Sequence, residues 1–289
     1  MHKTISPQFQ TTNDFLENFS LEDFNNPQRI RDYINFFALD KVCQSLDVDQ
    51  EESTSHWTVK SVSGEESTPL PPHFDDLCRL HYVVLSRRVL NVLEFGSGWS
   101  TRIMAEAMQL LRKNFGEWGT ENTRVETPFH IYSVEEDQRF SSITRERLGK
   151  RLAPYATVQQ SSVELILHDN RIATVFTKVP NISPDFIYLD GPSQYATSQE
   201  LNGFSFRHKC RMPMAADILR LEFFLEPGTF ILVDGRTANA RFLKAYLKRD
   251  WAYLHDEKGD VHYFELQEPP LGKFNKIKME FSLGSKFLL

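Results

Sequence analysis

Short apolar runs alternate along this chain with longer segments in which apolar residues recur at helical spacing. The runs cover residues 91–95, 130–134, 156–158, 185–189 and 228–233, and polar or glycine residues follow each of them. Residues 102–111 and 238–248 place apolar side chains every three or four positions, which is typical of one buried helical face. Strands that alternate with helices predict an α/β fold with a doubly wound, mostly parallel sheet.

The ends of the chain add different elements. Residues 251–255 and 261–266 alternate around a turn at 257–259, which predicts a C-terminal antiparallel hairpin. Asn26 and Pro27 indicate the start of an N-terminal helix, and residues 74–85 form a second helix before the first strand. A polar stretch, 47–69, separates them as a linker or lid. We therefore divide the chain into a mainly helical extension, 1–70, and a main domain, 71–289.

One segment inside the main domain lacks an obvious pattern. Residues 114–128 contain several charged residues and glycines, with little apolar periodicity. We interpret this segment as a surface insertion between the first helix and the second strand.

The most informative motif follows the first strand. Two glycines, Gly96 and Gly98, come directly after the apolar run 91–95 and allow the backbone to turn and to approach a ligand closely. Ser100 or Thr101 can cap the helix that follows. A strand, a glycine turn and a helix in this order predict a site for a nucleoside-bearing cofactor.

The third glycine position distinguishes two cofactor classes. A dinucleotide fingerprint needs a glycine where this chain has Thr101, so NAD binding is disfavoured. With Glu94 two residues before Gly96, the run Glu94-Phe95-Gly96-Ser97-Gly98-Trp99-Ser100 resembles instead the signature of class I S-adenosylmethionine-dependent methyltransferases. The resemblance covers roughly residues 72–266 and implies a Rossmann-like, seven-stranded sheet that ends in a reversed hairpin.

The resemblance also assigns cofactor-binding residues. In this family an acid at the end of the second strand accepts both ribose hydroxyls, which implies Glu135 here, with Glu136 beside it; Asp137 suits a helix cap. Ser161, after the third strand, corresponds to the adenine contact. The complete set of cofactor-binding candidates consists of the turn and the strand ends: Glu94, Gly96, Ser97, Gly98, Ser100, Thr101, Glu135, Glu136, Ser161 and Asp190.

The catalytic candidates lie beyond the fourth and fifth strands. Asp190 ends the fourth strand, where ligands of open α/β sheets bind, and is the leading candidate for the base that receives an acceptor proton. His208 is the second candidate. Asp234 occupies the corresponding place after the fifth strand, although it could equally turn the chain and pair with Arg236.

A long aromatic and basic segment, 194–211, leaves the sheet where the acceptor should lie. Its cationic side chains could hold an anionic acceptor, or they could form an ordinary solvated loop: Arg207, His208, Lys209 and Arg211.

Two related chemistries fit the sequence less well. Catechol-type O-methyltransferases bind a divalent ion through acids after the fourth strand and an Asp-Asn pair after the fifth, but Gly235 replaces the Asn here and Arg236 adds a positive charge. We therefore expect no metal. DNA methylation on an amine or on cytosine C5 would need an Asp/Asn-Pro-Pro-aromatic run or a Pro-Cys nucleophile, and the chain has neither.

The composition indicates which partners and which cellular compartment to expect. A chain of 289 residues with 40% hydrophobic content can bury a substantial core, and its net charge of −6 argues against a nucleic-acid groove. Apolar runs are too short to span a bilayer. The first residues turn polar at once, and three scattered cysteines suit a reduced compartment, so we expect a cytoplasmic protein with no membrane partner. The oligomeric state stays open.

Three functions are compatible with these patterns. The first is a methyltransferase that uses S-adenosyl-L-methionine to methylate a small molecule, on a hydroxyl oxygen of a sugar or another metabolite. The second is a methyltransferase-like protein that binds a nucleoside or a partner without transferring methyl. The third is a nucleotide-dependent oxidoreductase, against which the missing third glycine argues.

Overall fold

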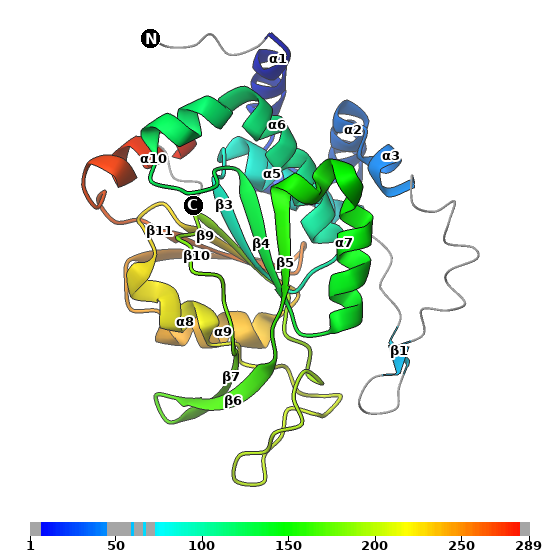
Figure 1. The fold of residues 1–289 in the computed structure, drawn as a ribbon, viewed down its shortest axis with the longest axis vertical. Coiled ribbons are helices and arrows are strands. Elements are labelled where there is room, and N and C mark those ends of the chain that lie inside the picture. The colour runs from blue at the N-terminus through cyan, green and yellow to red at the C-terminus, as the bar shows by residue number, and fades with distance from the viewer. Residues whose placement is uncertain (1–6, 45–58, 61–65, 68–72, 284–289) are drawn as a thin grey trace.

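The computed structural model describes residues 7–44, 59–60, 66–67 and 73–283. A seven-stranded sheet lies at the centre, with helices on both faces (Figure 1). Its strand order is β10-β11-β9-β8-β3-β4-β5. The parallel strands are β3 (Asn91–Phe95), β4 (His130–Glu135), β5 (Ala156–Gln160), β8 (Phe186–Leu189) and β9 (Phe230–Asp234). The antiparallel strands are β10 (Trp251–Asp256) and β11 (Val261–Leu266).

This topology confirms the predicted fold class. The chain runs outward from β3 to β4 and β5 and then returns to the other side of β3 through β8 and β9. The strand order therefore reverses between β3 and β8, the position at which open α/β sheets bind ligands. The central strands β3 and β8 are buried along their whole length, as their almost continuous apolar sequences predict.

Two apolar cores cover the two faces of the sheet. One face packs against α5 (Phe74–Ser86), α6 (Trp99–Asn122) and α7 (Gln138–Leu152), with the short η3 (Ala153–Tyr155) after them. The other face packs against α8 (Asp217–Leu221) and α9 (Thr237–Tyr246), and the short η4 (Glu222–Phe224) follows α8. Figure 1 shows α8 and α9 across the sheet from α5 and α6.

The predicted surface insertion at 114–128 is wrong for its first half. Helix α6 continues to Asn122, and Phe115 and Gly119 are buried. Phe115 lies four residues after the buried Leu111, so the apolar face of the helix persists, and Gly119 allows Pro128 to approach closely. Only the short connection from Thr123 to β4 is irregular.

The N-terminal helices join the first core. They are α1 (Pro7–Leu16), η1 (Leu21–Asn25), α2 (Pro27–Phe37) and α3 (Leu39–Gln44). Asn26 caps α2 as predicted, because its side chain accepts a hydrogen bond from the backbone of Gln28 at 2.9 Å. Tyr33 contacts His81 of α5, with 2.9 Å between Oη and Nδ1, and Tyr82 donates to the carbonyl of Phe19 at 2.7 Å.

Most of the predicted linker at 47–69 lies outside the described residues. Within it, β1 (Val59–Lys60) and β2 (Glu66–Ser67) form a short antiparallel pair. The division of the chain at residue 70 stays a prediction.

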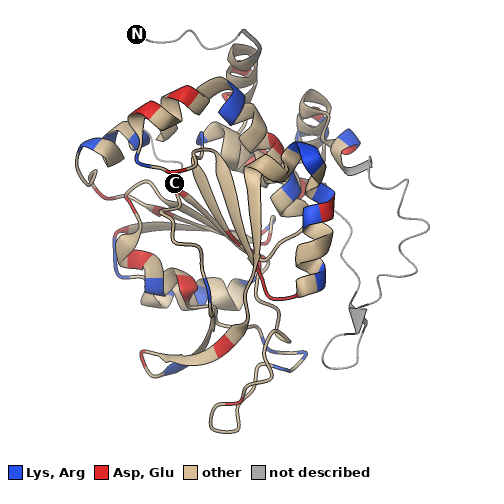
Figure 2. Ribbon diagram, viewed as in Figure 1, with Lys and Arg blue, Asp and Glu red and all other residues tan. Residues whose placement is uncertain are grey.

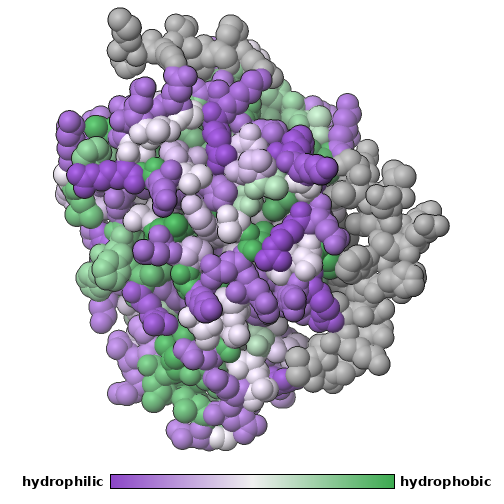
Figure 3. All heavy atoms as spheres, in the orientation of Figure 1, coloured by the Kyte–Doolittle hydropathy of each residue, from purple (hydrophilic) through white to green (hydrophobic). Residues whose placement is uncertain are grey.

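A second hairpin, which the sequence analysis did not predict, lies beyond β5. It consists of β6 (Val163–His168) and β7 (Arg171–Phe176). Leu167 on this hairpin is 56% exposed, and Figure 3 shows apolar residues gathered at this lower end of the molecule.

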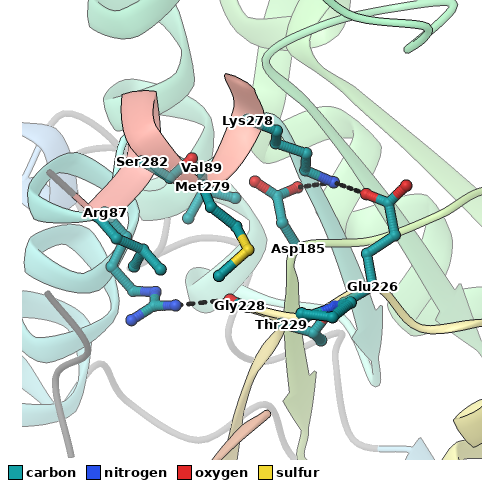
Figure 4. A pocket seen from close by; sticks show the side chains of 11 residues that line it. Arg87, Val89, Asp185, Glu226, Gly228, Thr229, Lys278, Met279 and Ser282 are labelled. Carbon is teal, nitrogen blue, oxygen red and sulfur yellow. Dashed lines mark hydrogen bonds and ion pairs between the residues drawn. The ribbon is translucent and has the colours of Figure 1, made fainter. Parts of the chain in front are cut away.

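The last helix, α10 (Lys273–Leu283), closes the amino edge of the sheet. Lys278 Nζ lies 3.0 Å from Glu226 Oε2 and 3.9 Å from Asp185 Oδ1, and Asp185 accepts hydrogen bonds from the backbone of Leu90 and Asn91 at the start of β3. Figure 4 shows these side chains around a cavity of about 10 Å³. This volume holds about one water and is too small for a cofactor or substrate. The ion pairs at the amino edge therefore stabilise the packing of α10 against the sheet.

Among the described residues, no helix is long and apolar enough to cross a bilayer.

Candidate active site

The strand register brings the predicted residues into one row at the carboxyl edge. Phe95 of β3 pairs with Val134 of β4 and with Leu189 of β8, and Leu189 pairs with Val233 of β9. The residues that follow these four therefore lie side by side across the sheet: Gly96, Glu135, Asp190 and Asp234. Four separate motifs of the sequence thus meet at the point where the strand order reverses.

The two glycines of the turn serve different purposes. Gly96 has a φ of +103°, and a Cβ there would lie 3.4 Å from the backbone of Asp190 and Gly191. A Cβ on Gly98 would meet no atom within 4 Å. Gly96 is therefore required by the backbone itself, whereas Gly98 faces open space that a ligand can occupy.

Glu94 stabilises the glycine turn through hydrogen bonds to its buried carboxylate. Its buried carboxylate accepts hydrogen bonds from Ser100 Oγ at 2.5 Å, from Thr101 Oγ1 at 2.6 Å and from Ser133 Oγ. Burial raises its pKa to about 7. Both carboxylate oxygens are engaged with protein hydroxyls, so Glu94 orients the start of α6 from below the turn.

The predicted helix cap at Ser100 or Thr101 is wrong in its details. Gly98 occupies the N-cap position of α6, and the hydroxyls of Ser100 and Thr101 donate to Glu94. Thr101 Oγ1 also accepts a hydrogen bond from the Gly98 N–H at 3.1 Å, which satisfies one free backbone group at the helix start.

Glu135 lies at the end of β4 next to the glycine turn. It accepts hydrogen bonds from Ser97 Oγ at 2.9 Å and from the backbone of Asp137 at 3.1 Å. Burial, and then the charge of Glu136, raise its pKa to about 8. Two protein donors leave part of its acceptor capacity free. Figure 2 shows the acidic stretch between β4 and α7 as a red segment.

The neighbours of Glu135 complete this side of the site. Glu136 Oε1 accepts from the backbone of Ser193, and Asp137 caps α7 as predicted. Ser161 donates its N–H to the carbonyl of Glu135 at 2.9 Å, while its hydroxyl accepts from the backbone of Lys178 at 2.9 Å. The side chain of Ser161 is thus engaged with the segment that follows the β6–β7 hairpin.

Asp190 lies on the other side of the turn. Solvent reaches its side chain, yet burial by the surrounding protein, followed by the charge of Asp234, raises its pKa to about 8. Asp234 accepts a hydrogen bond from Tyr188 Oη at 2.7 Å, and burial raises its pKa.

Arg236 braces the loop after β8. Its Nη1 donates to the carbonyl of Asp190 at 3.1 Å, and its Nη2 donates to that of Pro192 at 2.7 Å, next to the cis peptide between Gly191 and Pro192. The hydrogen bonds of Arg236 thus go to backbone carbonyls, and the partner of Asp234 is Tyr188.

His208 is not brought to this row by any described contact. It is exposed on the loop after β8, and its Nδ1 accepts from the backbone of Cys210 at 3.1 Å. Arg211 donates to the carbonyl of Ser205 at 2.5 Å and lies over the ring of Phe204. The basic side chains at 208 and 211 thus bond within their own loop, which extends below the sheet in Figure 1.

Sequence reasoning missed the contribution of α5. The helix begins at this edge with Asp75 and Asp76, and Arg79 Nη1 lies 2.6 Å from Asp76 Oδ1. Burial, then the charges of Asp234 and Asp75, raise the pKa of Asp76 to about 6. Two acids in the first turn of a helix signal only a favourable dipole interaction, so their pattern in the sequence does not place them in the site.

The described residues contain no group of three or more His, Cys, Asp or Glu side chains arranged to hold a metal ion.

No family model and no curated protein matches the sequence. Among solved structures, the chain is similar to an O-methyltransferase of Bacillus cereus in complex with SAH, at 13% identity over 78% of this chain and 90% of that chain, with a TM-score of 0.42. It is also similar to the SAH-bound methyltransferase PaMTH1 of Podospora anserina, at 12% identity over 93% and 99% of the chains, with a TM-score of 0.43.

A third similar structure is the O-methyltransferase TomG of Streptomyces achromogenes in complex with SAM, at 14% identity over 70% of this chain and 84% of that chain, with a TM-score of 0.39. The topology of the sheet itself establishes the fold: a Rossmann-like, doubly wound sheet with a C-terminal antiparallel hairpin, as the resemblance to class I methyltransferases implied.

Proposed function

We propose that the protein is an S-adenosylmethionine-dependent methyltransferase that acts on a hydroxyl oxygen of a small molecule. The observation that carries this proposal is the single row of Gly96, Glu135, Asp190 and Asp234 across the point where the strand order reverses. The location in the cytoplasm remains a prediction from the sequence.

The residues of the turn fit the cofactor. Glu135 has free acceptor capacity for the two ribose hydroxyls, and Ser97 holds its carboxylate in place. The open space beside Gly98 leaves room for the nucleoside. Ser161 lies next to Glu135 through its backbone, on the side assigned to the adenine ring. We assign no direct ligand contact to Glu94, whose oxygens are already engaged.

Bound S-adenosylmethionine would supply an electrophilic methyl group. We assign to Asp190 the role of the base: its ionised form would receive the proton of the acceptor hydroxyl, and a pKa raised to about 8 makes this form a stronger base than an ordinary carboxylate. Transfer of this methyl group to the acceptor oxygen would leave the electron pair of the broken carbon–sulfur bond on sulfur. Most of the acceleration comes from alignment of the two reactants, and Arg236 and Tyr188 fix the positions of Asp190 and Asp234.

Calorimetric titration of the purified protein tests this function. We expect S-adenosylmethionine and S-adenosylhomocysteine to bind, and NAD not to bind, because Thr101 replaces the third glycine of a dinucleotide turn. Binding of NAD in place of S-adenosylhomocysteine would overturn the proposal in favour of an oxidoreductase. Binding of S-adenosylhomocysteine without methyl transfer to any acceptor would indicate the catalytically silent alternative.

A further inference from the structure

The described side chains at the carboxyl edge carry more acids than bases. Asp190 follows β8 and Asp234 ends β9. Asp75 and Asp76 come from α5, and Asp260 comes from the turn between β10 and β11. Asp260 is held there because its carbonyl accepts from the backbone of Gly235 at 2.8 Å. A Cβ on Gly235 would lie 3.6 Å from its Oδ2. Acids from four separate segments thus converge beside the end of β9.

Two buried arginine side chains lie among these acids in the described part of the chain. Arg79 is only 1% exposed, with one Nη on Asp76, and Arg236 is buried with both Nη groups on backbone carbonyls. Arg79 counteracts the rise in the pKa of Asp76 and Asp234, and Arg236 does so for Asp190, but these two guanidinium groups face five carboxyl groups. Repulsion among the carboxylates raises the pKa of Asp76 and of Asp190 in addition to burial, which indicates surplus negative charge.

The hydroxyl of Tyr263 is buried near the same acids and has no hydrogen-bond partner among the described residues. Tyr263 of β11 pairs with Leu232, and Leu232 pairs with Tyr188, so the two tyrosines leave the sheet on one face. Tyr188 reaches Asp234, and Tyr263 is therefore aimed at the same acids. Tyr263 is fully buried, and among the described residues its Oη has no hydrogen-bond partner. An unpaired buried hydroxyl is costly, so a polar group is expected to complete it.

We propose that the methyl acceptor carries a protonated amine, and that the negative charge of Asp75, Asp76 and Asp260 attracts this ammonium group while the acceptor hydroxyl faces Asp190. An ammonium group has three N–H donors and no acceptor, so it can satisfy carboxylates and the Tyr263 oxygen together. This inference rests on the proposed function and specifies its substrate class. It opposes the anionic acceptor that the basic loop at 207–211 suggested.

Matched ligands test the charge of the acceptor. Two sets each share one carbon skeleton: glucosamine, glucose and glucuronate, and tyramine, tyrosol and 4-hydroxyphenylacetate. Binding is measured by NMR saturation transfer and calorimetry, with and without saturating S-adenosylhomocysteine. We expect the amine to bind best in at least one set. Asp76→Asn and, separately, Asp75→Asn and Asp260→Asn should each weaken amine binding about fivefold or more.

Control variants separate the alternatives. Asp169→Asn removes the same charge from an exposed turn outside the site and should leave amine binding unchanged. Equal binding of the alcohols, stronger binding of the carboxylates, or no amine preference in either set overturns the proposal. Loss of S-adenosylmethionine affinity in Asp76→Asn, with S-adenosylhomocysteine affinity retained, also overturns it, because the acids would then serve the sulfonium.

Failure of the wild-type protein to bind S-adenosylhomocysteine overturns the proposed function separately, since the amine preference is also measured without it. Because Asp76→Asn removes the partner of Arg79 and could unfold α5, circular dichroism accompanies each variant, and Asp75→Asn and Asp260→Asn give the same test without that contact.

Discussion

Gly96 and Gly191 lie back to back, so close that a Cβ on Gly191 would be 2.9 Å from the nitrogen of Gly96. The N–H of Asp190 also donates to the carbonyl of Phe95 at 3.0 Å. The turn after β3 and the loop after β8 are thus joined through their backbones. The two halves of the candidate site, one for the cofactor and one for the acceptor proton, therefore have a fixed relative position.

The two glycines of the turn should respond differently to substitution. Gly98 has extended backbone angles and open space, so Gly98→Val should fold normally and lose at least 100-fold in S-adenosylhomocysteine affinity by steric exclusion. Gly96→Ala should instead lower the free energy of unfolding by about 1–3 kcal/mol, because its φ of +103° strains any side chain. Thermal denaturation and calorimetry measure the two effects. Normal affinity in Gly98→Val would show that the space beside Gly98 is not the nucleoside site.

Glu135 should control cofactor affinity. Glu135→Ala removes a charge-assisted double hydrogen bond to the ribose and should cost about 1.5–3 kcal/mol of binding free energy. In the wild type, affinity should rise as the pH increases through about 8, the raised pKa of this carboxyl, because the ionised form is the better acceptor. Calorimetry from pH 6.5 to 9 measures both. Asp169→Asn, which removes a carboxylate from an exposed turn outside the site, serves as the control. An unchanged affinity in Glu135→Ala would remove the ribose assignment.

Buried acids should make the protein less stable as the pH rises above neutrality. Burial raises the pKa of Glu94 from 4.5 to about 7, so its contribution to stability is complete below pH 4.5 and is lost as the pH rises through 7. Asp217 behaves alike, with a pKa of about 7. His81, His130 and His262 act in the opposite direction, because burial lowers their pKa to about 3, 4 and 4, but most of their effect lies below pH 6.5, the pKa of the unfolded imidazole.

Between pH 6.5 and 8 the acids therefore dominate, and urea denaturation should show a falling free energy of unfolding. Glu94→Gln should reduce this fall by about 1 kcal/mol. A free energy of unfolding that rises over this interval would contradict the assignment of buried protonated acids.

Asp190 should affect chemistry more than binding. Asp190→Asn should lower the rate of methyl transfer by about 10²–10⁴ and leave S-adenosylhomocysteine affinity nearly intact. Tyr188→Phe, which removes only the hydrogen bond to Asp234, should have a much smaller effect. Transfer from isotope-labelled S-adenosylmethionine to the acceptor found by the amine comparison measures these rates.

The same assay distinguishes a base from an ion ligand. We expect no loss of turnover in EDTA. Loss in EDTA that Mg²⁺ restores, together with an equally damaged Asp234→Asn variant, would identify Asp190 and Asp234 as ligands of a divalent ion.

The sequence predicted those parts of the fold that depend on local pattern. The strands that end at Phe95, Leu189 and Asp234 were found because buried parallel strands are almost continuously apolar. The β6–β7 hairpin was missed although the sequence carries a signal, the Asp169-Asn170 pair, which suits a two-residue turn. In the structure both residues adopt the positive φ that such a turn needs.

The site was predictable only where strand ends define it. Glu135 and Asp190 follow directly from strand order, because the carboxyl ends of parallel strands share one edge. Asp76 and Tyr263 could not be placed, since their position depends on how α5 crosses the sheet and on the pairing of β11. Tertiary packing, rather than local pattern, determines these contributions.

Two hydrogen bonds join α5 to the N-terminal helices, one between His81 and Tyr33 and one from Tyr82 to the carbonyl of Phe19. They determine how far the chain can be shortened from its N-terminus. A protein that starts at residue 71 would lose the partners of His81 and Tyr82 and would expose the apolar surface that Phe9, Phe24 and Tyr33 now cover. Such a fragment would aggregate. The smallest stable form of the sheet domain therefore includes the helices before the polar stretch. Asn25 Nδ2 donates to Asp256 Oδ2 at 2.7 Å, which gives those helices a direct link to the end of β10.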